Sequence, residues 1–146
     1  MAEIFKIATL NINGMTADGI MGMLNEFMLK QEIDIILLQE VTHTDLESIR
    51  GYKTHFNIGI NKRGTTILTK EEISLKNITR LPSGRGMAAC YQGIWLVNIY
   101  APSGTANRQE REDFYNVELV YLLKSLPHND SWRRFQLRTV AGGLYR

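Results

Sequence analysis

The sequence predicts a layered α/β protein in which mixed or antiparallel sheets carry helices on their outer faces. Two features of the 146-residue chain indicate this class. The first third reads as strand, helix and strand, and the middle reads as short strands separated by turn residues before a second helix. With 44% hydrophobic and 22% charged residues, the composition is that of one soluble domain with a real core.

The first third predicts two strands and a helix between them. Phe5–Ile12 alternates in polarity and is rich in isoleucine, which predicts a strand that Asn13-Gly14 ends. Thr16–Gln31 has apolar residues at helical spacing, with Thr16 as the N-cap. The apolar run Ile33–Gln39 predicts a second strand that is buried on both faces. A short polar helix or turn is expected at residues 45–49.

The middle of the chain predicts antiparallel hairpins, because short strand-like runs alternate with glycine-containing turns. A second amphipathic helix is expected at Arg108–Ser125, with Phe114, Val117, Val120 and Tyr121 on one face. The predicted strands are Tyr52–Ile60, Thr65–Thr69, Ser74–Leu81, Met87–Tyr91 and Ile94–Tyr100.

Polar side chains gather where three of the predicted strands end. In open α/β sheets the carboxyl ends of the strands form the edge at which ligands bind. If the three strands are neighbours, Asn11, Glu40 and Tyr100 can line one pocket. The segments are ATLNINGM with Asn11 and Asn13, DIILLQEV with Gln39 and Glu40, and IWLVNIYAPSG with Asn98, Tyr100 and Ser103.

Among these residues, Glu40 is the one whose charge most needs a compensating group. A carboxylate at the end of a buried strand is costly to place unless a basic side chain or a metal ion compensates its charge. Glutamate and asparagine oxygens are hard ligands suited to Mg²⁺, which can bridge a phosphate oxygen. The Tyr100 hydroxyl could hold the same phosphate without adding charge. These residues outline a phosphodiester or phosphomonoester site.

Each of these residues also has an ordinary structural interpretation. Glu40 can be a surface or helix-capping acid, and Tyr100 can pack on the core as a strand-end aromatic. Asn98 lies in the middle of a predicted strand and can simply satisfy a backbone group. Arg63 can contact a phosphate backbone or lie in a solvated hairpin turn. Asn13 precedes a glycine, which is typical of a turn.

The order of four segments, TLNINGM, DIILLQE, RGTTILTK and WLVNIYAPSG, resembles the endonuclease/exonuclease/phosphatase superfamily. Within it, the likeness is greatest to exonuclease III, to apurinic/apyrimidinic endonucleases and especially to the endonuclease domain of LINE-type retrotransposons. The resemblance runs from about Ile4 to about Pro127. It implies a four-layered α/β sandwich of the DNase I type that cleaves phosphodiester bonds in DNA with Mg²⁺, or with Mn²⁺ in its place.

The resemblance also implies roles for individual residues. By position, Glu40 matches the metal-binding glutamate, and Asn11 matches the asparagine that supports metal and phosphate. Tyr100 matches the active-site tyrosine of the N-x-Y-x-P segment. Asn13 stands where the repair enzymes usually carry an aspartate, and Ser103 stands where they often carry an asparagine. Secondary candidates for phosphate or DNA contacts are Asn98, Ser103 and Arg63.

Residues 1–129 are accordingly expected to form the N-terminal part of such a domain, and residues 130–146 a separate basic tail. The superfamily next requires a strand ending in G-D-x-N and later an Asp–His pair, and this sequence contains neither. We therefore expect little or no turnover from this chain alone. Two explanations of the tail stay open. It can be out-of-frame translation, because one allowed coding sequence for Asp130–Val140 gives ILGGDFNCVL when read one nucleotide later, or a divergent tail that contacts phosphates.

The remaining features bound the cell compartment and the partners. The chain has a single cysteine, Cys90, which excludes an intrachain disulfide. We also expect no disulfide-linked partner. No signal peptide or membrane span is visible, so we expect an intracellular protein, nuclear if it functions on DNA. The expected partner is DNA, and the oligomeric state stays open. Two other functions stay open as well: a phosphatase acting on inositol phosphates or sphingolipids, and a non-catalytic fragment that binds nucleic acid.

Overall fold

The structure, a computed structural model, describes residues 5–14, 17–42, 51–60 and 63–127. The predicted N-cap Thr16, the polar helix or turn at 45–49 and the tail 130–146 lie outside the described residues. The described strands are β1 (Ile7–Asn11), β2 (Ile35–Val41), β3 (Tyr52–Ile58), β4 (Gly64–Lys70), β5 (Lys76–Arg80), β6 (Gly86–Tyr91) and β7 (Ile94–Ile99). The described helices are α1 (Ala17–Gln31), the 3₁₀ turn η2 (Thr105–Asn107), α2 (Arg108–Asp113), the π-helical turn η3 (Phe114–Glu118) and α3 (Leu119–Ser125).

The strands form two separate sheets. The first has the order β1-β2-β4-β3, in which β1 and β2 are parallel and the other pairs are antiparallel. The second is the antiparallel meander β5-β6-β7. The predicted hairpins are therefore confirmed for β3–β4, β5–β6 and β6–β7. The predicted mixed arrangement of strands is confirmed in the first sheet.

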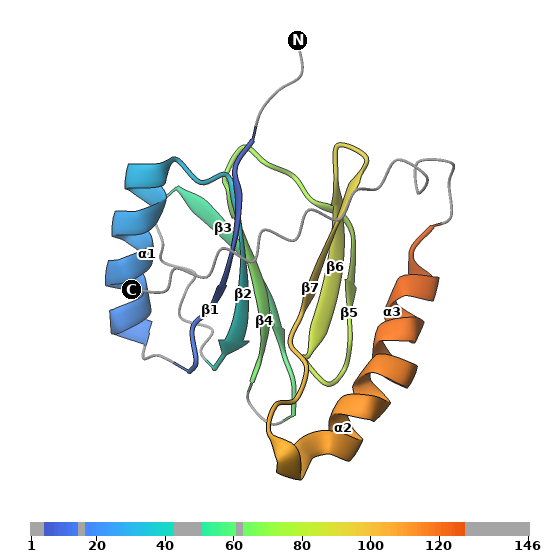
Figure 1. The fold of residues 1–146 in the computed structure, drawn as a ribbon. Coiled ribbons are helices and arrows are strands. Elements are labelled where there is room, and N and C mark those ends of the chain that lie inside the picture. Colours follow the sequence, from blue (N-terminus) through green and yellow to red (C-terminus); the bar gives the residue numbers. More distant parts are fainter. Residues whose placement is uncertain (1–4, 15–16, 43–50, 61–62, 128–146) are drawn as a thin grey trace.

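The elements stack in four layers, as Figure 1 shows. Helix α1 covers the outer face of the first sheet, the two sheets face each other, and α2 and α3 cover the outer face of the second sheet. Between the sheets, Ile35 and Ile67 of the first pack against Met87, Ala89 and Leu96 of the second. The predicted four-layered α/β sandwich is confirmed. Among the described residues, no helix has the length and apolar character needed to cross a membrane.

The second strand was predicted to end at Gln39, and that boundary is wrong. Strand β2 begins at Ile35 and ends at Val41, so Gln39 and Glu40 lie within the strand rather than after it. The end of the strand is paired with the residue that follows β1, because the Ile12 N–H donates to the Gln39 carbonyl at 3.1 Å. This extension gives Glu40 a place inside the sheet, which matters for the site below.

The buried face of the second helical segment also differs from the prediction. Phe114 is buried as expected, but Val117 and Tyr121 are 63% and 65% exposed. The exposed side of the segment also includes Val120. The cause is the π turn, in which the Leu119 N–H bonds to the Phe114 carbonyl and one extra residue enters the turn. Because of the extra residue, the side chains that pack against the second sheet after Phe114 are leucines, namely Leu119, Leu122 and Leu126.

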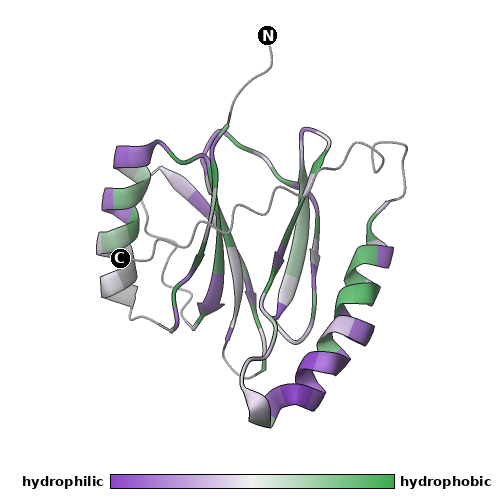
Figure 2. Cartoon of the chain, viewed as in Figure 1, coloured by the Kyte–Doolittle hydropathy of each residue, from purple (hydrophilic) through white to green (hydrophobic). Residues whose placement is uncertain are grey.

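Figure 2 shows the same segment by hydropathy: α2 is hydrophilic and α3 is mostly hydrophobic. The α2 residues are Arg-Gln-Glu-Arg-Glu-Asp, and none of them is buried. Helix α2 therefore contributes polar contacts to the loop beside it, whereas the π turn and α3 supply the packing against the second sheet.

Candidate active site

Glu40 occupies an irregular position in β2. Gln39 pairs with Thr65 and Val41 pairs with Gly64 of the neighbouring strand, so Glu40 is the extra residue of a β-bulge. Its φ angle is 55°, in the left-handed region that a glutamate rarely adopts, and its side chain is 9% exposed. Strained, buried positions of this kind cluster at functional sites.

The bulge decides which way the Glu40 carboxylate points. In a regular strand, successive side chains alternate between faces, so Glu40 would lie opposite Gln39 and face helix α1. Gln39 faces the second sheet, where its amide bonds to Asn98. The bulge instead brings the Glu40 carboxylate to the Tyr100 hydroxyl, just beyond β7 of the second sheet. The Gly14 N–H, which donates to the Glu40 carbonyl at 3.1 Å, holds the bulge against the turn after β1.

Tyr100 connects two charged side chains. Its hydroxyl lies near the Glu40 carboxylate and the Arg63 guanidinium, and both groups act on its pKa. Burial raises the pKa of Tyr100, the Glu40 carboxylate raises it further, and Arg63 opposes both effects. The phenol is protonated at neutral pH, as tyrosines ordinarily are, and its raised pKa keeps it so at higher pH, so it can donate a hydrogen bond. Arg63 is thus the basic side chain that acts on the same hydroxyl as Glu40.

Asn11 lies beside this group at the end of the neighbouring parallel strand. It pairs in register with Gln39, one residue before Glu40. Its side-chain oxygen accepts the Asn13 N–H at 2.8 Å, which closes a local turn. Asn13 has a φ of 48° and lies in that turn, so the turn interpretation describes this residue. The Asn11 side chain is exposed at the edge where Glu40 lies.

Asn98 has a different setting from the other candidates. It is 1% exposed, and its amide nitrogen donates to the carbonyls of Leu38 and Thr66, each at 3.0 Å. Its oxygen accepts from Gln39 at 2.8 Å, and the Gln39 amide also donates to Thr9 at 2.8 Å. Both N–H groups of the Asn98 amide therefore donate to backbone carbonyls of the first sheet. This geometry supports the interpretation that Asn98 joins the two sheets rather than contacts a phosphate.

We expect the substitution Asn98→Ala to lower the free energy of unfolding by about 2–3 kcal/mol, because it leaves buried carbonyls and the Gln39 amide without their partner. Urea unfolding followed by circular dichroism measures the loss. Thr69→Val is the matched control, since the Thr69 hydroxyl is fully buried and has no hydrogen-bond partner. It should change the free energy by less than about 1 kcal/mol. An Asn98→Ala variant as stable as this control would contradict the role of Asn98 as a link between the sheets.

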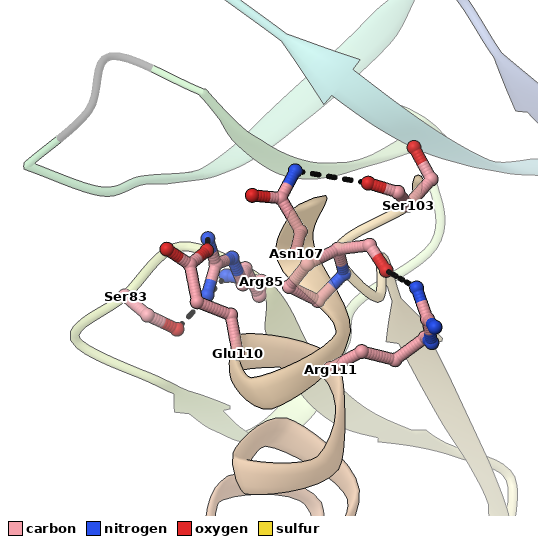
Figure 3. A network of polar contacts seen from close by, with 7 residues as sticks. Ser83, Arg85, Ser103, Asn107, Glu110 and Arg111 are labelled. Carbon is pink, nitrogen blue, oxygen red and sulfur yellow. Dashed lines mark hydrogen bonds and ion pairs between the residues drawn. The ribbon is translucent and has the colours of Figure 1, made fainter. Parts of the chain in front are cut away.

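Ser103 lies in the loop that follows Tyr100, and its side chain is exposed. Helix α2 and the turn before it hold this loop from below, as Figure 3 shows. The Asn107 amide donates to the Ser103 carbonyl at 2.9 Å, and Arg111 donates to the carbonyls of Pro102 and Gly104 at 3.4 and 3.0 Å. Sequence reasoning missed Asn107 and Arg111, because their partners are backbone carbonyls that no sequence pattern marks.

The oxygen donors at this edge fit a hard divalent cation. Asn11 offers an amide oxygen and Glu40 a carboxylate, and Mg²⁺ is commonly held by one or two such groups while it keeps several waters. Within residues 5–14, 17–42, 51–60 and 63–127, no three or more His, Cys, Asp and Glu side chains come together at metal-binding distance. The described residues therefore present one buried carboxylate at the site, with a neutral hydroxyl and an arginine beside it.

Comparisons with known proteins bear on the fold. No protein-family model matches the chain, and a search of curated proteins finds no match. Among solved structures, an AP endonuclease from Leishmania major matches with a TM-score of 0.68 and 18% identity over 88% of this chain and 49% of its own. A 3'-5' exonuclease from Neisseria meningitidis matches with a TM-score of 0.67 and 18% identity over 82% of this chain and 52% of its own. A 3' phosphatase from Neisseria bound to a product DNA hairpin matches with a TM-score of 0.60 and 16% identity, over 83% and 52%.

These structures agree with the resemblance that the four sequence segments carry. The chain spans about half the length of each of them, as expected for part of a larger domain. At 16–18% identity, what they establish is the architecture. This chain has the DNase I-like α/β fold of the exonucleases and AP endonucleases, over about half of their length.

Proposed function

We propose that this chain supplies the metal-binding and phosphate-binding part of a Mg²⁺-dependent DNA phosphodiesterase. The observation that carries the proposal is the meeting of Glu40, Tyr100 and Arg63, which come from three separate segments of the chain. A strained β-bulge turns the carboxylate toward that meeting point. A group that only packed the core would not need this backbone geometry.

Each residue has a role that follows from its chemistry. Glu40 and Asn11 would hold the metal through oxygen atoms, and Mn²⁺ could take the place of Mg²⁺. When bound, the metal would offset the charge that develops on a phosphate oxygen during hydrolysis. Tyr100, whose phenol is protonated at neutral pH, would donate a hydrogen bond to the phosphate. Arg63 would pair with the same phosphate through its guanidinium group.

We further propose that this chain alone turns over little or no substrate. Hydrolysis requires a group that orients or deprotonates the attacking water, usually a histidine or a carboxylate. The one carboxylate that the described residues place beside Tyr100 is Glu40, and it is assigned to the metal. The water-activating group would come from a further segment. Residues 1–129 would then be the N-terminal part of the domain, and 130–146 an out-of-frame or divergent tail.

DNA is the substrate we infer, since one similar structure contains a product DNA hairpin and the others are an AP endonuclease and a 3'-5' exonuclease by name. The sequence likeness points further, to an endonuclease of the LINE retrotransposon type acting inside the cell, in the nucleus. A phosphatase is the second candidate, because the structure with bound DNA is itself named as a 3' phosphatase. A fragment that binds nucleic acid without catalysis is the third.

The experiment begins with the gene. DNA sequence across codons 127–146 should continue as ILGGDFN in the frame one nucleotide later, and that frame should lead to an Asp–His segment. The frame-restored protein and the 146-residue chain should then be assayed with Mg²⁺ on supercoiled plasmid, on abasic DNA and on a 3'-phosphorylated oligonucleotide. Nicking by the restored protein alone would support the endonuclease. Release of phosphate without nicking would favour the phosphatase, and no cleavage of any substrate would overturn both.

A further inference from the structure

One turn contacts the backbones of both Arg63 and Tyr100, the two residues near Glu40 at the candidate site. This turn, residues 82–86, connects β5 to β6 in the second sheet. A Cβ atom added to Gly84 would lie 2.7 Å from the Arg63 carbonyl oxygen, so Gly84 lies directly against the Arg63 backbone. The next carbonyl along, that of Arg85, accepts the Tyr100 N–H at 2.8 Å. Neighbouring residues of a single turn therefore contact the backbones of Arg63 and Tyr100.

The contact also includes Gly59, at the other end of the segment that connects β3 to Arg63. A Cβ atom at Gly59 would collide with the Ser83 carbonyl, and Gly59 N–H donates to the Arg63 carbonyl at 3.1 Å. Gly84 has a φ of 80°, which favours glycine, so neither partner tolerates a side chain at the contact. Gly59 and Arg63 thus lie backbone to backbone on the turn, which fixes the position of the Arg63 backbone.

Two buried side chains of the first sheet hold the turn in place. The Thr65 hydroxyl donates to the Gly84 carbonyl at 3.1 Å. The Asn57 amide donates to the Gly86 carbonyl at 2.7 Å and reaches the Thr65 hydroxyl at 3.4 Å. Thr65 is fully buried and Asn57 is 7% exposed, so water does not compete for these bonds.

The far side of the turn is tied to the helical layer. The Arg85 guanidinium pairs with Glu110 of α2 at 3.2 Å, and the Arg85 N–H donates to the Ser83 hydroxyl at 3.3 Å (Figure 3). Glu110 is largely exposed, which makes this ion pair a modest contribution. The buried bonds from Thr65 and Asn57 are the stronger restraint.

We propose that Thr65 and Asn57 are positioning residues, which act through the turn at 82–86 to set the pairing of Arg63 with Tyr100 at the candidate site. The catalytic use of that pair rests on the proposed function, whereas the positioning can be measured in the 146-residue chain without turnover. Thr65 also pairs with Gln39 beside the Glu40 bulge, so the role proposed for it belongs to its hydroxyl and not to its backbone. Both residues act on the site through backbone contacts of one turn.

The test uses Thr65→Val, which removes the hydroxyl and keeps the shape of the side chain. Thr69→Val on the same strand is the matched control, because that buried hydroxyl has no partner. Thr65→Ser, which restores the hydroxyl, is the rescue variant. The chain is labelled with ¹⁵N-arginine and with tyrosine carrying ¹³C at Cζ, and the signals are assigned by Arg63→Lys and Tyr100→Phe.

In Thr65→Val, the guanidinium ¹⁵N signals of Arg63 should shift toward those of free arginine, because the guanidinium is no longer held beside Tyr100. The Tyr100 Cζ signal should shift as well, because the cation beside the phenol has moved away. Thr69→Val and Thr65→Ser should leave both signals as they are in the unaltered chain. A folded Thr65→Val variant with both signals unchanged would overturn the proposal.

A second measurement applies if Thr65→Val does not fold. In the unaltered chain, the Gly59 N–H donates to the Arg63 carbonyl and the Tyr100 N–H donates to the Arg85 carbonyl of the turn. If the turn holds both segments together, these two amides should exchange through one shared opening event. Their exchange rates, corrected for local sequence, should agree within about threefold over a range of denaturant concentrations. Rates that differ throughout would show that the two segments move independently, and would overturn the proposal. Neither measurement depends on nicking, so failure of the proposed function would be seen separately.

Discussion

The substitution Phe114→Ala is expected to lower the free energy of unfolding by about 3–5 kcal/mol, the usual loss for a fully buried phenylalanine. Phe114 is 0% exposed at the first position of the π turn. It packs in the cluster that includes Trp95 and Leu122, between the second sheet and its helical layer. No other side chain can fill the space, because the surrounding residues belong to rigid strands and a short helix. Chemical denaturation followed by circular dichroism measures the change.

Tyr121→Ala is the control for this prediction. The sequence pattern places Phe114 and Tyr121 on one helical face, yet Tyr121 is 65% exposed. Its replacement should change the free energy of unfolding by no more than about 0.5 kcal/mol, as is usual at the surface. Comparable losses for Phe114→Ala and Tyr121→Ala would mean that the segment is a regular α-helix with the predicted face buried, and the π turn would be wrong.

The helix error shows the limit of periodicity. The pattern located the segment correctly, because leucine, valine and aromatic residues recur along Arg108–Ser125. It could not reveal the extra residue at Phe114–Glu118, since a π turn is stabilised by tertiary packing and has no sequence period of its own. One inserted residue rotates every later position of the helix by about 100°.

The positions of the strands were easier to predict than the pairing between them. Alternation and turn residues are local signals, and they located every strand that the structure describes to within a few residues. The pairing of β2 with β4 rather than with β3 is a long-range choice that local signals do not contain. The bulge at Glu40 is of the same kind, because it arises where Gly64 and Thr65 of a distant strand pair across it.

The candidate site divides in a similar way. Glu40 and Tyr100 could be proposed together, because polar residues at strand ends gather at one edge of a sheet, and the structure does bring them into contact. Asn57 and Thr65 could not be proposed, since their importance lies in bonds to the carbonyls of Gly84 and Gly86. Backbone acceptors leave no signature in a sequence, so residues that position a site are harder to find than residues that form it.

Glu40→Gln is the substitution with the largest expected effect on function. In the frame-restored protein, it should reduce Mg²⁺-dependent nicking by about 1,000-fold, because the metal loses its charged ligand and several kcal/mol of transition-state stabilisation. In the 146-residue chain, it should abolish the Mg²⁺-dependent shifts of the Tyr100 ¹³C signal. The glutamine keeps an acceptor for the Tyr100 hydroxyl, so the fold should be retained.

Glu112→Gln provides the control for this charge change. Glu112 is an exposed carboxylate of α2 whose partner, Arg108, belongs to the same helix. Glu112→Gln therefore removes one negative charge at a position away from Glu40 and Tyr100. It should leave both nicking and the Mg²⁺-dependent shifts intact. If Glu40→Gln nicks DNA as fast as this control, then Glu40 is not a metal ligand. The strained bulge would then serve to hold the Glu40 carboxylate near the Tyr100 hydroxyl.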